Sequence, residues 1–373
     1  MGQFTKTPRS GERGYEESPV FKAIRLNATT YPIDNVEREE LARAGAEFIE
    51  IEGQEPHEIL AAAEDCDALL VVSSRVPASV IERLSRCRVI ARLGAGTDKI
   101  DVAEATYRGI VVTNVPDFCL NEQAEHTLTL LLAFARRLPF MIEAMRTHNW
   151  TARHHPGVHR LAGQTLGLIG FGASARAVAQ RASAFGLRLR AWVRDPAKYR
   201  DFAKQLHVEL VPLDRLLSES DFVSIHLPLC DETYHLLSAE RLAHLKPTAV
   251  LINTARGAIV DEAALVTLLQ QRKIAGAALD VFEGIDVFAL PGTPAAHPLL
   301  ELDNVILTPH SAGSSVESSR ESKVRGARNA ADVLLGVRPR SVVNPDVVPR
   351  FPLQAGLLVG SGTARRAGDV REM

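Results

Sequence analysis

A glycine-rich turn at residues 170–175 is the first stretch whose residue types suggest chemistry. It reads Gly-Phe-Gly-Ala-Ser-Ala and follows the apolar run 165–169. Gly170 permits a tight turn, Gly172 lets the backbone approach a pyrophosphate, and the small Ala175 lets the next helix pack on a sheet. The free N–H groups and the positive dipole at the start of that helix would face the phosphates. The turn therefore predicts a dinucleotide site.

A second recognition point for the dinucleotide lies at the end of the strand predicted at 187–193. An acidic side chain there would bind the ribose hydroxyls of NAD. This position holds Val193, and Arg194 follows it. A guanidinium favours the 2′-phosphate of NADP, although Asp195 is near enough to reach back to a ribose and an exposed arginine can simply be solvated. The sequence thus predicts NAD or NADP, with NADP favoured.

Four histidines between residues 148 and 159 suggest a metal site at first sight. His148, His154, His155 and His159 lie in a polar, irregular stretch. They have no helical spacing and no carboxylates nearby, whereas metal-binding histidines normally show a regular ligand spacing. We interpret the stretch as a loop or a subunit contact and predict no metal.

The elements that would position these residues alternate between strand and helix. Strands are predicted at 20–26, 68–72, 89–93, 110–113, 165–169, 187–193, 222–227, 249–253, 277–281 and 305–308. Helices are predicted at 39–44, 77–84, 121–137, 175–185, 262–272 and 315–335. Repeated strand–helix units favour an α/β fold in which helices cover both faces of parallel sheets.

Composition excludes several classes of function. The 373 residues include 46% hydrophobic side chains, and the formal net charge is −2. That balance gives no electrostatic basis for binding nucleic acid or a membrane, and no apolar run is long enough for a membrane span or a signal peptide. The four cysteines, Cys66, Cys87, Cys119 and Cys230, fit neither a disulfide framework nor a zinc site. We expect reduced thiols and a cytoplasmic protein.

Six stretches, in order along the chain, resemble the D-isomer-specific 2-hydroxyacid dehydrogenases, closest to the bacterial branch that is similar to C-terminal-binding proteins. They are RLGAGTDKID at 92–101, VTNVPD at 112–117, LGLIGFG at 166–172, NTARG at 253–257, ALDV at 278–281 and TPH at 308–310. The resemblance covers about residues 20–346. It implies an oxidoreductase that transfers a hydride between nicotinamide and a small 2-keto or 2-hydroxy acid.

The family resemblance also implies the domain arrangement. A flavodoxin-like substrate domain would be built from 20–116 and 312–346, and a Rossmann cofactor domain from 117–311 would be inserted into it. Both would be doubly wound parallel sheets, with a cleft between them. Residues 1–19 and 347–373 would be a disordered extension and a loose tail. Homodimers in this family form through the cofactor domain, to which the stretch near 140–160 would contribute.

Residues that would bind and transform the substrate follow from the resemblance. Arg256 corresponds to the arginine that anchors the substrate carboxylate, which suits a planar, bidentate guanidinium. The backbone N–H groups near Ala95 and Gly96 correspond to a second carboxylate cradle. His310 corresponds to the general acid and base, a role that suits imidazole because its pKa lies near neutral pH.

The resemblance further implies residues that would hold the cofactor. Asp280 corresponds to the residue that hydrogen-bonds the nicotinamide carboxamide, and Pro228 to a loop on the adenine side. Thr254 and Gly313 join the cofactor-binding set. Gly313 also stands where the C-terminal-binding-protein branch has a tryptophan, so its small size would open the substrate pocket.

One position departs from the family pattern. A glutamate five residues after Asp280 pairs with the catalytic histidine in the family, and a nearby negative charge of this kind favours imidazolium. The residue here is Ile285. Glu283 and Asp286 are neighbours that would substitute for it if the loop bulged at Gly284. The sequence leaves both carboxylates open, with Glu283 included among the catalytic candidates.

Three functions remain consistent with these residues. The first is a reductase or dehydrogenase of small 2-keto or 2-hydroxy acids, specific for the D isomer. The second is a dinucleotide-sensing regulatory or corepressor-like protein with little catalysis, which the missing glutamate would permit. The third is a dehydrogenase of a different small anion that needs no proton relay. The first is favoured because Arg256, His310 and the dinucleotide turn occur together.

Overall fold

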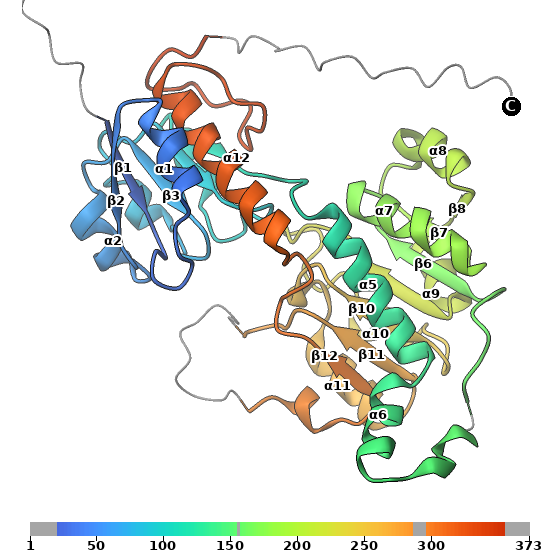
Figure 1. Ribbon diagram of the computed structural model, residues 1–373. Coiled ribbons are helices and arrows are strands. Elements are labelled where there is room, and N and C mark those ends of the chain that lie inside the picture. Colours follow the sequence, from blue (N-terminus) through green and yellow to red (C-terminus); the bar gives the residue numbers. More distant parts are fainter. Residues whose placement is uncertain (1–20, 155–156, 286–295, 355–373) are drawn as a thin grey trace, which may run out of the picture. The chain divides into compact units, whose positions relative to one another are not determined.

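The computed structural model describes residues 21–154, 157–285 and 296–354, which form two compact units (Figure 1). In the described chain, the first unit contains residues 21–91, 102–113 and 326–354, and the second contains 92–101 and 114–325. The loop 92–101 thus belongs by its contacts to the second unit, although it follows a strand of the first.

A five-stranded parallel sheet forms the centre of the first unit, in the order β2-β1-β3-β4-β5. Its strands are β1 (Phe21–Arg25), β2 (Ala46–Glu50), β3 (Ala68–Val71), β4 (Val89–Arg92) and β5 (Val111–Thr113). Four of them were predicted from apolar runs. Strand β2, at the edge of the sheet, has no such run and is not predicted, and its side chains are partly buried or exposed. This order is the doubly wound, flavodoxin-like one.

Short helices surround the first sheet. They are α1 (Asn35–Ala42), α2 (Pro56–Ala63), α3 (Ala78–Ile81) and α4 (Val102–Tyr107), together with the C-terminal part of α12 (Val316–Leu334). Helix α1 begins at Asp34, where a capping box with Glu37 satisfies the first backbone N–H groups. Arg328 of α12 forms an ion pair with Glu40 of α1, which joins these two helices.

A seven-stranded parallel sheet forms the second unit, in the order β12-β11-β10-β9-β6-β7-β8. Its strands are β6 (Thr165–Ile169), β7 (Arg188–Trp192), β8 (Val208–Leu210), β9 (Phe222–Ile225), β10 (Val250–Asn253), β11 (Gly276–Leu279) and β12 (Val305–Leu307). The order is that of a Rossmann fold with one further strand. The strand order reverses between β6 and β9, because β7 and β8 follow on one side of β6 and β9 lies on the other. The carboxyl ends of these two strands define the switch point where ligands bind in such sheets.

Helices cover both faces of the second sheet. The helices of the second unit include α5 (Leu120–Ala135), α6 (Leu138–Arg146), α7 (Ala173–Ala182), α8 (Pro196–Gln205), α9 (Leu213–Glu219), α10 (Ala239–Leu242) and α11 (Glu262–Gln270), with the 3₁₀ helices η1 (Trp150–His154), η2 (Ser183–Phe185), η3 (Gly257–Ile259) and η4 (Pro298–Glu301). Helices α5 and α7 lie next to each other on one face of the sheet (Figure 1). Leu128 and Leu131 of α5 and Val178 of α7 belong to the buried core beneath them. Helices α9, α10 and α11 enclose the core of the opposite face.

The predicted α/β fold with two parallel sheets is confirmed. Strands β6, β9, β10 and β11 are buried along their whole length, as expected for central strands covered on both faces. No helix in the described part of the chain is long and apolar enough to cross a membrane. The predicted terminal extension 1–19 lies outside the described residues, as does most of the predicted tail.

Candidate active site

The glycine-rich turn adopts the strand–turn–helix geometry that its sequence predicts. Gly170 follows β6 with a φ of +94°, and a Cβ there would lie 2.5 Å from the carbonyl oxygen of His226. Only glycine fits this approach between the ends of β6 and β9. Gly172 is the N-cap of α7, and a Cβ on it would meet no atom within 4 Å. Ala175 is fully buried in the helix–sheet contact.

This turn fits the pyrophosphate of a dinucleotide. The open space at Gly172 lies in front of the first N–H groups of α7, a helix of 10 residues. His226 is held beside the turn, because its ring nitrogens lie 3.4 Å from Ser174 Oγ and 2.9 Å from Ser224 Oγ. Burial lowers the pKa of His226 to about 4, so this ring is neutral at neutral pH.

The end of β7 presents an arginine and no free carboxylate. Val193 is buried and Arg194 is exposed. Asp195 is the N-cap of α8, and its Oδ1 accepts a hydrogen bond from Ala197 N at 3.1 Å. The structure therefore assigns a capping role to the one carboxylate that the sequence left available for a ribose. Pro228 lies on the loop after β9, where its carbonyl accepts from Thr233 Oγ1 at 2.7 Å.

Arg256 lies just beyond the carboxyl end of β10. Asn253 shapes this turn, since its Oδ1 accepts from Ala255 N at 3.0 Å and its Nδ2 donates to the Arg256 carbonyl at 2.9 Å. A Cβ at Gly257 would lie 2.1 Å from the carbonyl carbon of Phe282, so the backbone packs too closely for any larger residue. Thr254 is buried, with its hydroxyl 3.1 Å from that of Thr127.

The guanidinium of Arg256 lies against the loop 92–101 of the same unit. A Cβ at Gly96 would lie 1.8 Å from Arg256 Nη2. Asp98 Oδ1 accepts hydrogen bonds from Arg256 Nε at 3.2 Å and from Nη2 at 3.1 Å. Asn114 Nδ2 donates to the Ala95 carbonyl at 2.7 Å, which fixes the loop. The structure thus brings together Arg256 and the predicted backbone cradle.

Asp280 holds the loop that carries His310. Its Oδ1 accepts from Thr308 Oγ1 at 2.5 Å and from Ser311 N at 2.9 Å, while its Oδ2 accepts from Ala312 N at 2.8 Å. Its carbonyl accepts from His310 N at 2.8 Å. His310 has a φ of +53°, a conformation that few non-glycine residues adopt and that these bonds stabilise. Contact with a nicotinamide stays a prediction for Asp280.

The surroundings of His310 favour the neutral imidazole. Burial and the positive charge of Arg256 lower the pKa of His310 to about 4, against the opposing effect of Asp280 and Asp98. Arg92, at the start of the loop 92–101, acts in the same direction as Arg256. The charges that act on His310 therefore come from the loop 92–101 and from the residues just after β10 and β11, all in the second unit.

Glu283 has its own partners in the described structure. Its Oε1 lies 2.7 Å from His235 Nε2 and 3.3 Å from the Tyr234 hydroxyl. The carboxylate of Glu283 is therefore paired with His235, whereas the sequence had suggested His310 as its partner. A catalytic role for Glu283 stays a prediction. Ile285 is partly buried, and Asp286 lies outside the described residues.

Two residues near Arg256 were not identified from the sequence as functional. Asp98 and Arg92 both lie in the RLGAGTDKID stretch, for which only the backbone N–H groups near Ala95 and Gly96 were predicted to bind substrate. A third, Cys119, faces Gly313, where a Cβ would lie 3.0 Å from Cys119 Sγ. Burial raises the pKa of Cys119 to about 12, so this thiol is protonated. The close contact leaves little room for a larger residue at position 313.

Three of the four histidines between 148 and 159 lie in the described part of the chain, namely His148, His154 and His159. Among the described residues, no group of three or more histidine, cysteine or acidic side chains is placed to hold a metal ion. The His154 ring accepts a hydrogen bond from Arg153 Nε at 3.0 Å, and His155 lies outside the described residues. All four cysteines are free thiols, and three of them are buried.

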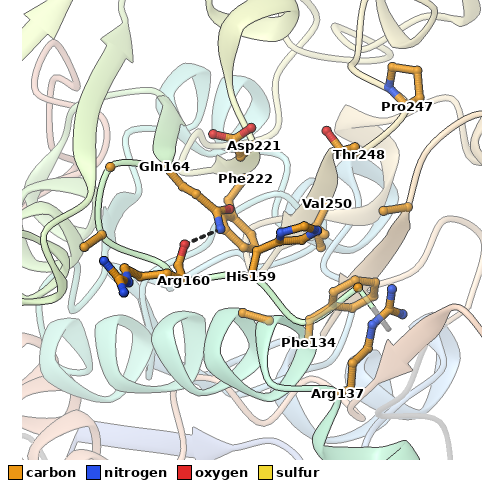
Figure 2. Close-up of a pocket in the computed structure, with 15 residues that line it drawn as sticks. Phe134, Arg137, His159, Arg160, Gln164, Asp221, Phe222, Pro247, Thr248 and Val250 are labelled. Carbon is orange, nitrogen blue, oxygen red and sulfur yellow. Dashed lines mark hydrogen bonds between the residues drawn. The ribbon is translucent and has the colours of Figure 1, made fainter. Parts of the chain in front are cut away.

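A cavity of about 660 Å³ lies at the opposite end of the second sheet (Figure 2). Its walls include Gln164, Asp221 and Thr248, which come before strands β6, β9 and β10. The candidate residues Gly170 and Arg256 come after β6 and β10. Because ligands of open parallel sheets bind at the carboxyl ends, this cavity is not the active site.

The chain resembles known enzymes over most of its length. Residues 128–312 match the family model of the NAD-binding domain of D-isomer specific 2-hydroxyacid dehydrogenases. Glyoxylate reductase of Korarchaeum cryptofilum is 41% identical over 79% of this chain and 87% of that protein. D-3-phosphoglycerate dehydrogenase of Methanocaldococcus jannaschii is 38% identical over 81% of this chain and 56% of its own length.

Solved structures agree with the sequence relatives. The NADPH-dependent glyoxylate/hydroxypyruvate reductase of Sinorhizobium meliloti, in complex with NADP and malonate, superposes with a TM-score of 0.76. It is 30% identical, and the alignment covers 90% of this chain and all of that one (100%). The glycine turn, the arginine after β10 and the histidine after β12 belong to an NAD(P)-dependent oxidoreductase. The chain is a member of the D-isomer specific 2-hydroxyacid dehydrogenase family, which confirms the predicted family, activity and cofactor class.

Proposed function

We propose that this protein is a reductase of a small 2-keto acid such as glyoxylate, with a preference for NADPH. The observation that carries the proposal is the contact of Arg256 with Gly96 in the second unit, where a guanidinium and a backbone loop converge. A guanidinium matches the two oxygens of a carboxylate, and backbone N–H groups beside it add further donors. A carboxylate anchor of this kind suits a 2-keto acid better than a simple aldehyde or ketone.

His310 supplies the proton in this proposal. Its ring would donate to the carbonyl oxygen as that oxygen gains negative charge, and in the reverse direction it would accept the proton of a 2-hydroxy acid. Nicotinamide, when bound, supplies or accepts the hydride. Asp280 orients the ring through the loop that it holds, since it bonds both sides of His310.

Charge at the end of β7 supports the preference for NADPH. Arg194 is exposed next to the buried Val193, while Asp195 is occupied as the N-cap of α8. The 2′-phosphate of NADP would gain a charge-assisted contact from Arg194, whereas the ribose hydroxyls of NAD would lack a free carboxylate. One such contact corresponds to about 1.5–3 kcal/mol, or roughly a 10- to 150-fold change in affinity.

Steady-state kinetics would test the proposal directly. Purified protein is assayed with NADPH and NADH against glyoxylate, hydroxypyruvate, pyruvate and phenylpyruvate, by following absorbance of the reduced cofactor. We expect turnover with the smallest acids and a kcat/KM at least about tenfold higher with NADPH. Arg194→Gln should remove that preference, and Arg200→Gln, an exposed arginine on α8, is the matched control. No turnover with any acid would refute the activity.

The exposed apolar surface of α6 supports a homodimer. Side chains of α6 and η1 that are large, apolar and exposed are Leu138, Phe140, Ile142, Met145 and Trp150. Leu138, Ile142 and Met145 are spaced i, i+4 and i+7, so they lie on one face of α6. An exposed apolar face of this kind normally marks a protein interface, and a two-fold axis would place two copies of it together. Sedimentation of Ile142→Glu should show a monomer, and Phe185→Glu, an exposed phenylalanine of η2, should leave the dimer intact.

A further inference from the structure

Asp98 and Arg256 are 158 residues apart in the sequence and form an ion pair at the candidate active site. One carboxylate oxygen, Oδ1, accepts from both Nε and Nη2 of the guanidinium, at 3.2 and 3.1 Å. The two side chains are 31% and 26% exposed, so the pair lies neither on the open surface nor in the core. Both residues lie in the second unit, Asp98 on the loop after β4 and Arg256 after β10.

Protein contacts within the described part of the chain use three of the guanidinium N–H bonds of Arg256. Of its five N–H bonds, the one on Nε and one on Nη2 point to Asp98, and one on Nη1 points to the Ala255 carbonyl at 2.7 Å. Each of the two terminal nitrogens, Nη1 and Nη2, therefore keeps one N–H bond that these contacts do not use. A carboxylate accepts such a pair with both oxygens.

We propose that Asp98 is a positioning residue for the 2-keto acid. It holds Arg256 by the Nε–Nη2 side of the guanidinium, so that the Nη1–Nη2 end receives the substrate carboxylate. The negative charge of Asp98 also offsets the effect of the positive guanidinium on His310. The proposal rests on the function proposed above. It gives Asp98 two separable effects, one geometric and one electrostatic.

The electrostatic effect follows from the charges that surround His310. Arg256 and Arg92 oppose its protonation, whereas Asp280 and Asp98 favour it. Although burial of Asp98 disfavours its own charge, Arg256 holds the pKa of this carboxyl below its usual range, so Asp98 remains ionised. Asp280 is committed to the loop of His310 by four hydrogen bonds. Asp98 is therefore the carboxylate that can be changed without dismantling that loop.

Three substitutions separate the two effects. Asp98→Asn keeps an acceptor oxygen for Arg256 and removes the charge, Asp98→Ala removes both, and Asp98→Glu keeps the charge. Asp303→Asn is the matched control, because Asp303 pairs with Arg272 at an exposed site of the same unit. Thermal unfolding establishes that each variant is folded, and if the alanine variant is not, the asparagine and glutamate variants carry the test.

Kinetics with NADPH and glyoxylate provide the first readout. In Asp98→Asn, we expect the pKa that limits reduction on the alkaline side to fall by about 0.5–1 unit, with KM for glyoxylate changed less than about threefold. In Asp98→Ala, the same shift should accompany a KM that rises about tenfold or more, because the guanidinium is no longer held. Asp98→Glu should restore the pH profile. A merely structural ion pair would instead alter the unfolding temperature and leave the pH profile of kcat in place.

NMR provides a readout that does not need turnover. With histidines labelled at Cε1, His310→Gln identifies the His310 signal among the 12 histidines. Its titration should move to lower pH in Asp98→Asn and stay unchanged in Asp303→Asn. If the wild type reduces no 2-keto acid, the proposed function fails, and the NMR titration still decides the role of Asp98. An unchanged His310 titration in Asp98→Asn would overturn the electrostatic effect, and an unchanged KM in Asp98→Ala would overturn the geometric one.

Discussion

The guanidinium of Arg256 lies so close to the α-carbon of Gly96 that a Cβ at position 96 would stand 1.8 Å from Nη2. Such a distance is impossible, so the side chain of Arg256 has its position only because residue 96 is glycine. This relationship links a backbone loop after β4 to a cation after β10. It makes the loop part of the arrangement that would hold a substrate carboxylate.

Gly96→Ala should therefore displace Arg256 and weaken the binding of 2-keto acids. A shift of about 1 Å in an anchoring group can cost about 100-fold in kcat/KM. We expect a loss of that order for glyoxylate, measured by steady-state kinetics with NADPH. The dissociation constant of NADPH, measured by fluorescence, serves as the internal control and should stay within about threefold of the wild type. An unchanged kcat/KM would show that the guanidinium is not held against residue 96.

The two glycines of the dinucleotide turn should respond differently to alanine. Gly170→Ala places a Cβ 2.5 Å from the His226 carbonyl oxygen at a φ of +94°, so it should destabilise the free protein by about 1–3 kcal/mol. A Cβ at Gly172 meets no atom within 4 Å, so Gly172→Ala should leave the unfolding temperature unchanged.

Gly172→Ala should instead weaken nucleotide binding, because its Cβ would stand where a pyrophosphate approaches the helix α7. Thermal unfolding with and without NADPH measures both effects. If Gly172→Ala lowers the stability of the free protein as much as Gly170→Ala does, the open space beside Gly172 is not a ligand site.

The stability of the fold should fall between pH 6.5 and about 4, partly through two histidines. The pKa values of His226 and His310 are both lowered to about 4, mainly by burial. In the unfolded chain these histidines take up protons near pH 6.5, whereas in the folded protein they do so only near pH 4. The stability that they contribute is therefore complete above pH 6.5 and decreases as the pH falls toward 4. Unfolding temperatures at pH 7.5 and 5 measure the loss. His226→Asn and His310→Gln should each reduce this loss of stability. If the difference in unfolding temperature between pH 7.5 and 5 is unchanged in both variants, the two histidines do not cause the loss.

Binding of a substrate analogue should raise the pKa of His310. A carboxylate at Arg256 adds negative charge near a ring that the guanidinium keeps neutral, so oxamate should bind together with a proton. Titration calorimetry between pH 5 and 7, in the presence of NADH and in buffers of different ionisation enthalpy, measures this uptake. His310→Gln should bind oxamate without it. Proton release, or uptake that persists in His310→Gln, would contradict the coupling.

Much of the fold could be predicted because its signals are local. The turn at Gly170 and Gly172 combines a buried strand, two glycines and a helix within a few residues, and it forms as predicted. Edge strand β2 escaped prediction because Ala46–Glu50 has neither an apolar run nor a regular alternation. The partial exposure of an edge strand weakens the pattern on which such predictions depend.

The contacts of the candidate site could be predicted less well, because they join residues that are distant in sequence. Arg256 and His310 were named from their motifs, but no sequence spacing connects Arg256 with Asp98. Glu283 seemed available to His310 in the linear sequence, and the fold places its carboxylate on His235. The branch within the family and the domain ranges given from the sequence stay predictions.

Recognition of the substrate carboxylate by Arg256 can be measured by comparing two substrates. Glyoxylate and acetaldehyde both offer an aldehyde carbonyl, but only glyoxylate carries a carboxylate. We expect the wild type to prefer glyoxylate in kcat/KM with NADPH by about 100-fold or more, since a bidentate, charge-assisted pair contributes about 3 kcal/mol or more. Arg256→Ala should lose most of this preference while its rate with acetaldehyde changes little. Equal losses on both substrates, or a preserved preference for glyoxylate, would show that Arg256 does not recognise the carboxylate.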